Sequence, residues 1–175
     1  MKYHIEKNTI QETLVIPLYA RALCTRRFPH LFSDPLSVEL LEQLDYDFSA
    51  LERTSGSLMQ TFGAMEAAMR QSDLAWEVRD YLADHPQAAV VNLGCGLDQT
   101  GRSCDNGQCR LYNIDLPDVM AVREALLPAG EREKNLTADL NDLSWFDAID
   151  TPLEDGAVFF AAGVFYYFRT EQVQA

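Results

Sequence analysis

The chain has 175 residues, of which 47% are hydrophobic and 23% charged, the balance of a globular domain that can bury a sizeable core. Its formal net charge of −13 disfavours a nucleic-acid partner, because an acidic surface repels phosphates. The apolar stretches are too short to cross a bilayer and the first residues carry no apolar signal core, so we expect a cytoplasmic protein with no membrane segment.

Two helix starts are visible in the first third of the chain. Thr9 and Glu12 have the spacing of a capping box ahead of an apolar pattern, and Pro17 is expected to kink or split the helix that follows. Asp34 followed by Pro35 predicts a second helix, with the acid as its N-cap and the proline in its first turn.

A long helix is predicted over residues 58–83, where Phe62, Met65 and Met69 fall on one face. We interpret this face as core packing. Residues 1–84 are therefore predicted to form a helical N-terminal cap with a lead-in helix.

From residue 85 on, strands alternate with helices. The continuous apolar run over 88–93, followed by glycines, predicts a strand buried on both faces. Further strands are predicted over 110–114, 135–138 and 157–162, and helices over 117–127, 144–149 and from residue 170. This order predicts an α/β fold with a parallel sheet. Because the sequence stops one turn into a helix after the fourth strand, residues 85–175 are predicted to be the N-terminal half of a Rossmann-like domain, truncated after that strand.

The connection between the first two strands holds two of the four cysteines. A short helical turn is expected after Leu97, followed by a tight turn at Asn106-Gly107. Cys104 and Cys109 flank that turn, so a disulfide or a metal pair is one alternative. We favour free thiols and predict no metal, because no second pair of ligands accompanies them.

The chemistry is predicted to centre on Gly94-Cys95-Gly96, a G-x-G turn directly after the first buried strand. Glycines let the backbone bend sharply and approach a ligand, and ligands of open α/β sheets lie beyond the carboxyl ends of the strands. Asp115, at the end of the second predicted strand and 19 residues after Gly96, has the spacing of an acid that accepts both hydroxyls of a ribose. The alternative is an acid that caps the helix beginning near Pro117.

The pattern indicates an adenosine-type ligand without a pyrophosphate. A dinucleotide motif would have a third glycine where the chain has Gln99, and Asp98 would place negative charge beside the phosphates. S-adenosylmethionine (SAM), which has no phosphate and carries a sulfonium cation, suits these residues better. Asp139, after the third predicted strand, has the position to accept a hydrogen bond from an adenine amino group, with an ordinary loop aspartate as the alternative.

Seven short segments occur in a characteristic order. They are ETLVIPLYARA (12–22), FSDP (32–35), DYDF (45–48), VNLGCGLD (91–98), DNG (105–107), DLP (115–117) and SW (144–145). Together they resemble the leucine carboxyl methyltransferase family, especially its bacterial branch of polyketide-type O-methyltransferases, over nearly the whole chain. The resemblance implies a class I SAM-dependent methyltransferase, with a helical N-terminal cap over a Rossmann-like sheet.

By position, the resemblance implies roles for several residues. Gly94 and Gly96 would line the methionine part of SAM, Asp115 would hold the ribose, and Asp139 and Leu140 would frame the adenine. The remaining predicted cofactor positions are Arg70, Asn92, Cys95, Asp98, Leu116 and Ala162.

The chain departs from the family pattern at several positions. Arg70 would match the arginine that meets the SAM carboxylate, but Gln71 follows it where a threonine-like residue is expected. Ala162-Gly163 stands where the family usually has Glu-Gly, and Gln99 where it usually has threonine.

The sequence therefore predicts a SAM-dependent O-methyltransferase that acts on a hydroxyl or carboxylate of a small molecule. No catalytic base is assigned, because an ionised acceptor mainly needs alignment with the methyl group. Three alternatives stay open: a non-catalytic SAM-binding or partner-binding remnant, a protein C-terminal carboxyl methyltransferase, and a nicotinamide dehydrogenase, which Gln99 disfavours.

Aromatic residues gather around the last predicted strand. Tyr166 and Tyr167 are interpreted as packing under the cap, with a border of the acceptor pocket as the alternative. The free edge of the strand predicts self-association or poor solubility, with four phenylalanines nearby: Phe159, Phe160, Phe165 and Phe168.

Overall fold

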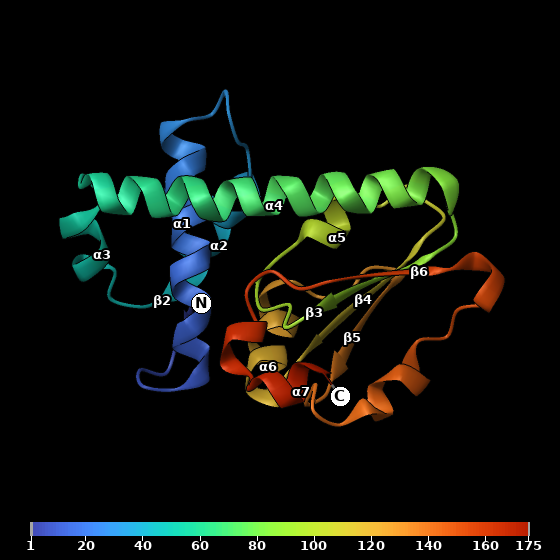
Figure 1. Ribbon diagram of the computed structural model, residues 1–175. Coiled ribbons are helices and arrows are strands. Elements are labelled where there is room, and N and C mark those ends of the chain that lie inside the picture. Colours follow the sequence, from blue (N-terminus) through green and yellow to red (C-terminus); the bar gives the residue numbers. More distant parts are fainter. Residues whose placement is uncertain (1, 175) are drawn as a thin grey trace. The chain divides into compact units, whose positions relative to one another are not determined.

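The longest helix, α4 (Leu58–Asp84, 27 residues), confirms the helix predicted over 58–83. The computed structural model describes residues 2–174. The residues up to Ser72 and those from Asp73 on form two compact units, and the boundary between them lies inside α4 (Figure 1). The domain division after residue 84 coincides with the end of this helix and stays a prediction.

The unit up to Ser72 is mostly helical. Its elements are β1 (Tyr3–His4), η1 (Ile10–Leu14), α1 (Val15–Arg27), α2 (Pro35–Gln43), β2 (Leu44–Asp45), α3 (Ser49–Thr54) and the first part of α4. The strands β1 and β2 pair in parallel. No prediction covers them, because a strand of two residues leaves no periodic pattern in a sequence.

The capping box expected at the first helix start is displaced by one residue. The Thr9 hydroxyl accepts a hydrogen bond from the Gln11 amide, and the Glu12 carboxylate accepts one from the Asn8 amide. Each donor lies one residue before the capping-box partner, because the turn η1 is a 3-10 helix, which is wound more tightly than an α-helix.

The two prolines both lie in the first turn of a helix. A separate helix, α1, begins at Val15, so the split is confirmed, and Pro17 lies in its first turn, where a missing N–H costs little. Asp34 is the N-cap of α2: its side chain accepts from the Ser37 amide at 3.0 Å, and Pro35 is the first helical residue.

Where α1 and α4 meet, the core of this unit contains small side chains. One buried cluster there consists of Cys24, Ala64 and Ala68. Met65 packs against the cluster as predicted, but Phe62 and Met69 are 65% and 60% exposed, so the prediction of core packing is wrong for them. The two alanines are four residues apart and form the face of α4 that meets α1, which turns Phe62 and Met69 away from it.

Four parallel strands form the sheet of the second unit. They are β3 (Ala89–Leu93), β4 (Arg110–Asp115), β5 (Glu133–Thr137) and β6 (Ala157–Phe160), in the order β5-β4-β3-β6 (Figure 1). The predicted strands and their parallel pairing are confirmed, with ends that differ by one or two residues. The protein therefore has the predicted Rossmann-like α/β fold.

Helices and 3-10 turns connect the strands. They are α5 (Thr100–Ser103), α6 (Pro117–Leu126), η2 (Leu143–Ala148), η3 (Leu153–Asp155), η4 (Phe165–Tyr167) and α7 (Thr170–Gln174). The helical turn expected after Leu97 is α5, and the helix expected over 144–149 is the 3-10 helix η2. Within residues 2–174, none of the helices combines the length and the apolarity that a membrane span requires.

Both faces of the sheet are covered at β3, which explains the continuous apolar run of this strand. On one face Val90 packs with Leu111 of β4 and Val78 of α4. On the other face Val91 packs with Trp145 of η2. Because β4 lies on one side of β3 and β6 on the other, the strand order reverses at β3, and such a switch point is where open α/β sheets bind ligands.

Candidate functional site

The glycine turn lies directly beyond the carboxyl end of β3, at the switch point. The amides of Gly94 and Cys95 both donate to the carbonyl of Ile114, at 2.9 and 3.1 Å, which ties the turn to the end of β4. Gly94 and Gly96 have φ angles of +64° and +48°, a left-handed conformation that glycine adopts without steric cost. The two glycines are therefore required by the backbone path of this turn.

Asp115 connects the turn to β4 through its side chain. One carboxylate oxygen accepts from the Gly96 amide at 2.8 Å, and the other accepts from the Leu116 amide at 2.8 Å. Burial raises the pKa of Asp115, and the hydrogen bonds from Gly96 and Leu116 oppose that rise. The structure thus brings the predicted glycine and the predicted acid together. The N-cap residue of α6 is Leu116, so the alternative in which Asp115 caps this helix is wrong.

The side chain of Asp98 turns inward and is bound by its neighbours. It is 8% exposed, and its carboxylate accepts from the Asn92 side chain at 3.0 Å and from the amide and hydroxyl of Thr100 at 3.1 and 2.9 Å. The interpretation that Asp98 disfavours a pyrophosphate by its charge stays a prediction. Its observed contacts fold the turn against β3 and the start of α5.

Cys95 is also directed into the protein. Its sulfur lies 3.8 Å from the sulfur of Met120 on α6, and burial raises the pKa of its thiol to about 12. All four cysteines are buried and free. Among the described residues, no group of three or more His, Cys, Asp or Glu side chains is placed to hold a metal ion.

The segment after β5 reaches the site through its backbone. The Ala138 amide donates to the carbonyl of Asp115 at 2.9 Å. The Asp139 carboxylate accepts from the amide and side chain of Asn141, and these bonds lower its pKa. Leu140 is partly buried and packs with the cluster around Trp145. Asp139 therefore directly follows a residue that is bonded to the Asp115 backbone, and its own bonds to Asn141 also fit the loop alternative.

The segment after β6 closes over Gly94. A Cβ atom added to Gly94 would lie 2.6 Å from the Cβ of Val164, so the two segments are in contact across the switch point. Ala162 and Gly163 lead into this contact, and Gly163 has a φ of +107°. Val164 is missing from the predicted site. The only sign of Val164 in the sequence is its place two residues after Ala162, where the predicted strand ends.

Three predicted or discussed residues lie on the surface. Arg70 is exposed on α4, in the unit up to Ser72, and its place in the cofactor site stays a prediction. Tyr166 and Tyr167 are 71% and 64% exposed, so the interpretation that they are packed is wrong.

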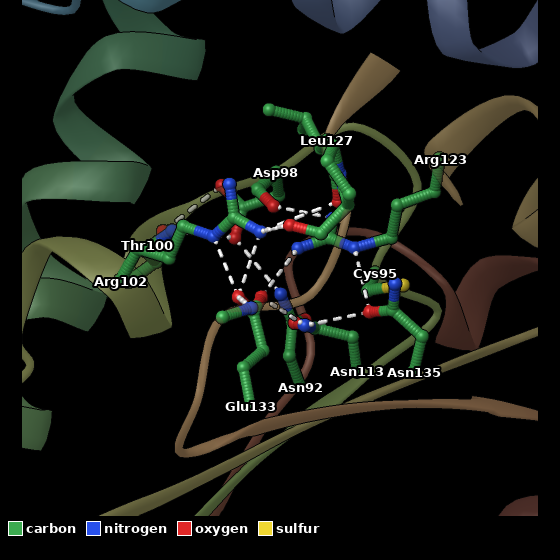
Figure 2. Close-up of polar contacts among 12 residues, drawn as sticks. Asn92, Cys95, Asp98, Thr100, Arg102, Asn113, Arg123, Leu127, Glu133 and Asn135 are labelled. Atoms are coloured by element: carbon green, nitrogen blue, oxygen red, sulfur yellow. Dashed lines mark hydrogen bonds and ion pairs between the residues drawn. The ribbon is translucent and has the colours of Figure 1, made fainter. Parts of the chain in front are cut away.

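A buried polar network lies beneath the glycine turn, and most of its residues are absent from the predicted site. Asn92, Asn113 and Asn135 are aligned in register across β3, β4 and β5. The guanidinium of Arg123, on α6, reaches from the Gly96 carbonyl to Glu133 of β5 (Figure 2). In the sequence, Arg123 is visible only as an arginine within the apolar pattern of this helix.

Comparisons with known proteins agree on one family. Residues 15–175 match the model of the leucine carboxyl methyltransferase family. The chain is 33% identical over 162 residues to the tetracenomycin polyketide synthesis O-methyltransferase TcmP of Streptomyces glaucescens. That alignment covers 91% of this chain and 57% of the relative, so the chain spans a little more than half of the relative's length.

Proposed function

The chain belongs to the leucine carboxyl methyltransferase family, and on that premise we propose that it binds SAM and serves methyl transfer to an oxygen of a small molecule. The relative's name suggests the acceptor class, a hydroxyl or carboxylate of a polyketide-type compound. The same proposal places the protein in the cytoplasm. The observation that carries the proposal of SAM binding is the contact between Asp115 and Gly96 at the switch point.

The carboxylate of Asp115 fits a ribose. Each of its oxygens has one protein partner, Gly96 or Leu116. An ionised carboxylate can accept roughly four hydrogen bonds, so each oxygen keeps a lone pair for one of the two hydroxyl groups of a ribose. The protein bonds fix the carboxylate in place and leave this capacity free.

The bonding of the turn favours a ligand without a pyrophosphate. A pyrophosphate at a glycine turn is held by backbone N–H groups. Here the amides of Gly94 and Cys95 donate to Ile114, and that of Gly96 donates to Asp115. SAM has no phosphate and needs no such donors.

The other contacts to SAM follow by position and are part of the proposal. Gly94 and Gly96 would line the methionine part, and Asp139 and Leu140 would frame the adenine. Arg70 would meet the carboxylate of SAM. The positions with supporting roles around these contacts are Asn92, Cys95, Asp98, Leu116 and Ala162.

The chain's part in the reaction is to bind and to align. SAM supplies an electrophilic methyl group on a sulfonium, whose thioether is a good leaving group. Asp115 fixes the ribose, and the turn that its carboxylate holds sets the position of the rest of the cofactor. Alignment of this kind is a large source of rate enhancement, so the proposal names no catalytic base.

A non-catalytic SAM-binding protein is the second candidate. The observation that favours it is Ala162, which stands where the resemblance places a glutamate that faces the cofactor. Such a protein would bind SAM through Asp115 without transferring its methyl group.

A transfer assay separates the two candidates. The purified chain is incubated with SAM that carries a labelled methyl group and with a panel of phenolic and carboxylic polyketide-type acceptors. The proposal predicts label in an acceptor and none with Asp115→Ala. Binding of SAM without transfer to any acceptor would support the second candidate. If no SAM is bound, both are rejected.

A further inference from the structure

The residue beneath the glycine turn that has no place in the proposed cofactor contacts is Arg123. It is fully buried on α6, with an exposed fraction of 0%. Its Nη1 donates to the Gly96 carbonyl at 2.9 Å and to the Asp98 carbonyl at 2.7 Å (Figure 2). Hydrogen bonds from a charged donor are about twice as strong as neutral ones, so these two bonds are a strong constraint on the turn.

The peptide groups on both sides of Gly96 are therefore held from two directions. The amide of Gly96 is bound by the carboxylate of Asp115 from β4, and its carbonyl is bound by Arg123 from α6. Met120, three residues before Arg123 on the same helix, contacts Cys95 of the turn. Residues three apart share a helix face, so one face of α6 supports the turn at two points.

Arg123 is itself held by the sheet. Its Nε donates to the Asn135 side chain at 3.3 Å, and its Nη2 lies 3.4 Å from a Glu133 oxygen. Burying an arginine is costly unless its charge is paired and its donors are bonded. Here every nitrogen of the guanidinium has an acceptor, and all four acceptors belong to the turn or to β5. The orientation of the side chain is therefore set.

Glu133 is shared with a second arginine. Arg102 of α5 donates to it at 2.7 Å, and Asn113 donates to its other oxygen at 2.6 Å. Burial acts to raise the pKa of Glu133, but the hydrogen bonds from Arg102 and from the Gly130 amide outweigh it and lower that pKa overall. The other partners of Arg102 are the carbonyls of Leu127 and Pro128, not the turn.

We propose that Arg123 is a positioning residue for the cofactor, because its guanidinium fixes the Gly96–Asp98 carbonyls and so sets the shape in which the glycine turn meets SAM. This inference rests on the proposed function. Arg123 does not touch the cofactor in this account. It acts through Gly96: Arg123 holds the carbonyl of this residue, and the amide of the same residue donates to the ribose-binding carboxylate of Asp115.

The two arginines around Glu133 give a matched pair of variants. Arg123→Lys keeps the buried charge, but a single ammonium cannot reach both turn carbonyls, Asn135 and Glu133 together. Arg102→Lys weakens bonds to the same Glu133 without touching the turn. Asn135→Ala, which removes one acceptor of Arg123 and has no contact with the turn, is a second route to the same effect if Arg123→Lys does not fold.

Two readouts are measured on each folded variant. In the absence of ligand, amide hydrogen exchange of Gly96 reports the turn, with Val91 as the reference for global opening. Calorimetric titration gives the SAM dissociation constant. For Arg123→Lys we expect faster exchange at Gly96 and not at Val91, and a dissociation constant about tenfold higher, equivalent to about 1.4 kcal/mol. Asn135→Ala should change the exchange rate of Gly96 and the SAM dissociation constant in the same direction, but by less. Arg102→Lys should leave the exchange rate and the dissociation constant unchanged.

The outcomes are distinct. A wild-type chain that is folded and binds no SAM rejects the proposed function, and the positioning role falls with it. Wild-type binding that Arg123→Lys leaves unchanged rejects the positioning role alone. An equal loss of affinity in Arg123→Lys and Arg102→Lys shows a general loss of stability and also rejects it.

Discussion

Among single residues, Asp115 combines two features that belong to a binding site. It is buried enough to raise its pKa, yet its carboxylate keeps acceptor capacity beyond its bonds to Gly96 and Leu116. The glycine turn and this acid are predictable from the sequence, because the motif fixes their spacing of 19 residues. Arg123 is not predictable, because a basic residue in the last turn of a helix is usually a solvated partner of the helix dipole.

The raised pKa of Asp115 predicts how SAM affinity depends on pH. Ribose hydroxyls donate to the ionised carboxylate, so affinity is present above the folded-state pKa and is lost as pH falls through it. Because burial raises that pKa above 3.8, the loss begins at a higher pH than for an ordinary aspartate. The dissociation constant is measured by calorimetry from pH 7 to about pH 4, with near-UV circular dichroism as the control for folding. Constant affinity over this range in folded protein would contradict the assignment.

A second residue-scale prediction concerns the buried ion pair of the first unit. The side chains of Arg21 and Asp34 are 7% and 4% exposed and 3.1 Å apart, and Asp34 also caps α2. Asp34→Ala would leave the arginine buried without this partner, at a cost of about 3–5 kcal/mol in the free energy of unfolding. Urea titration measures it. The control is Asp47→Ala, which removes an exposed bond to the Ser49 amide and should cost about 1 kcal/mol. Equal losses of unfolding free energy in Asp34→Ala and Asp47→Ala would contradict the claim that burial makes the Arg21–Asp34 pair costly to break.

At the scale of elements, the sequence predicts best where a pattern has one structural solution. The apolar run of β3 must be a strand covered on both faces, and Asp34-Pro35 must begin a helix. The burial of α4 is not predictable in this way. Phe62 and Met69 look like core residues by type, but small alanines form the face that packs against α1. Side-chain type alone does not say which face of a long helix meets a neighbour.

The contact between the segments after β3 and β6 gives an element-scale prediction. Gly94→Ala introduces a Cβ at a φ of +64° and 2.6 Å from Val164, so it should destabilise the fold by at least about 1–2 kcal/mol, the usual cost of a left-handed residue. Gly101→Ala is the matched control. Its added Cβ would lie 3.9 Å from Leu111 and Val90, and alanine in a helix is favoured by about 0.5–1 kcal/mol. The free energies of unfolding are compared. A neutral Gly94→Ala would show that the two segments do not meet.

For the whole molecule, the sequence predicts the α/β sheet and its parallel order, since alternating strands and helices allow few other topologies. The network around Arg123 has no such signature. It depends on side chains from β3, β4, β5, α5 and α6 that meet only after the sheet has formed, as Figure 2 shows.

The free edge of β6 predicts self-association, because β6 pairs with β3 and, within the described residues, with no strand on its other side. Phe159 and Phe165 beside it are 43% and 49% exposed. The average mass from light scattering should rise with protein concentration. Phe165→Glu should reduce that rise, whereas Leu31→Glu, at an apolar residue of the other unit that is 73% exposed, should not. A concentration-independent monomer mass would contradict the prediction.

The central claim is that this chain binds SAM through the turn and Asp115, and calorimetric titration of SAM into the purified chain tests it most directly. NAD serves as the ligand control and Asp115→Ala as the protein control. The account predicts saturable binding of SAM, no binding of NAD, and loss of SAM binding in Asp115→Ala with the fold retained. No heat of SAM binding in a folded wild-type chain, or SAM binding that survives Asp115→Ala, would contradict it.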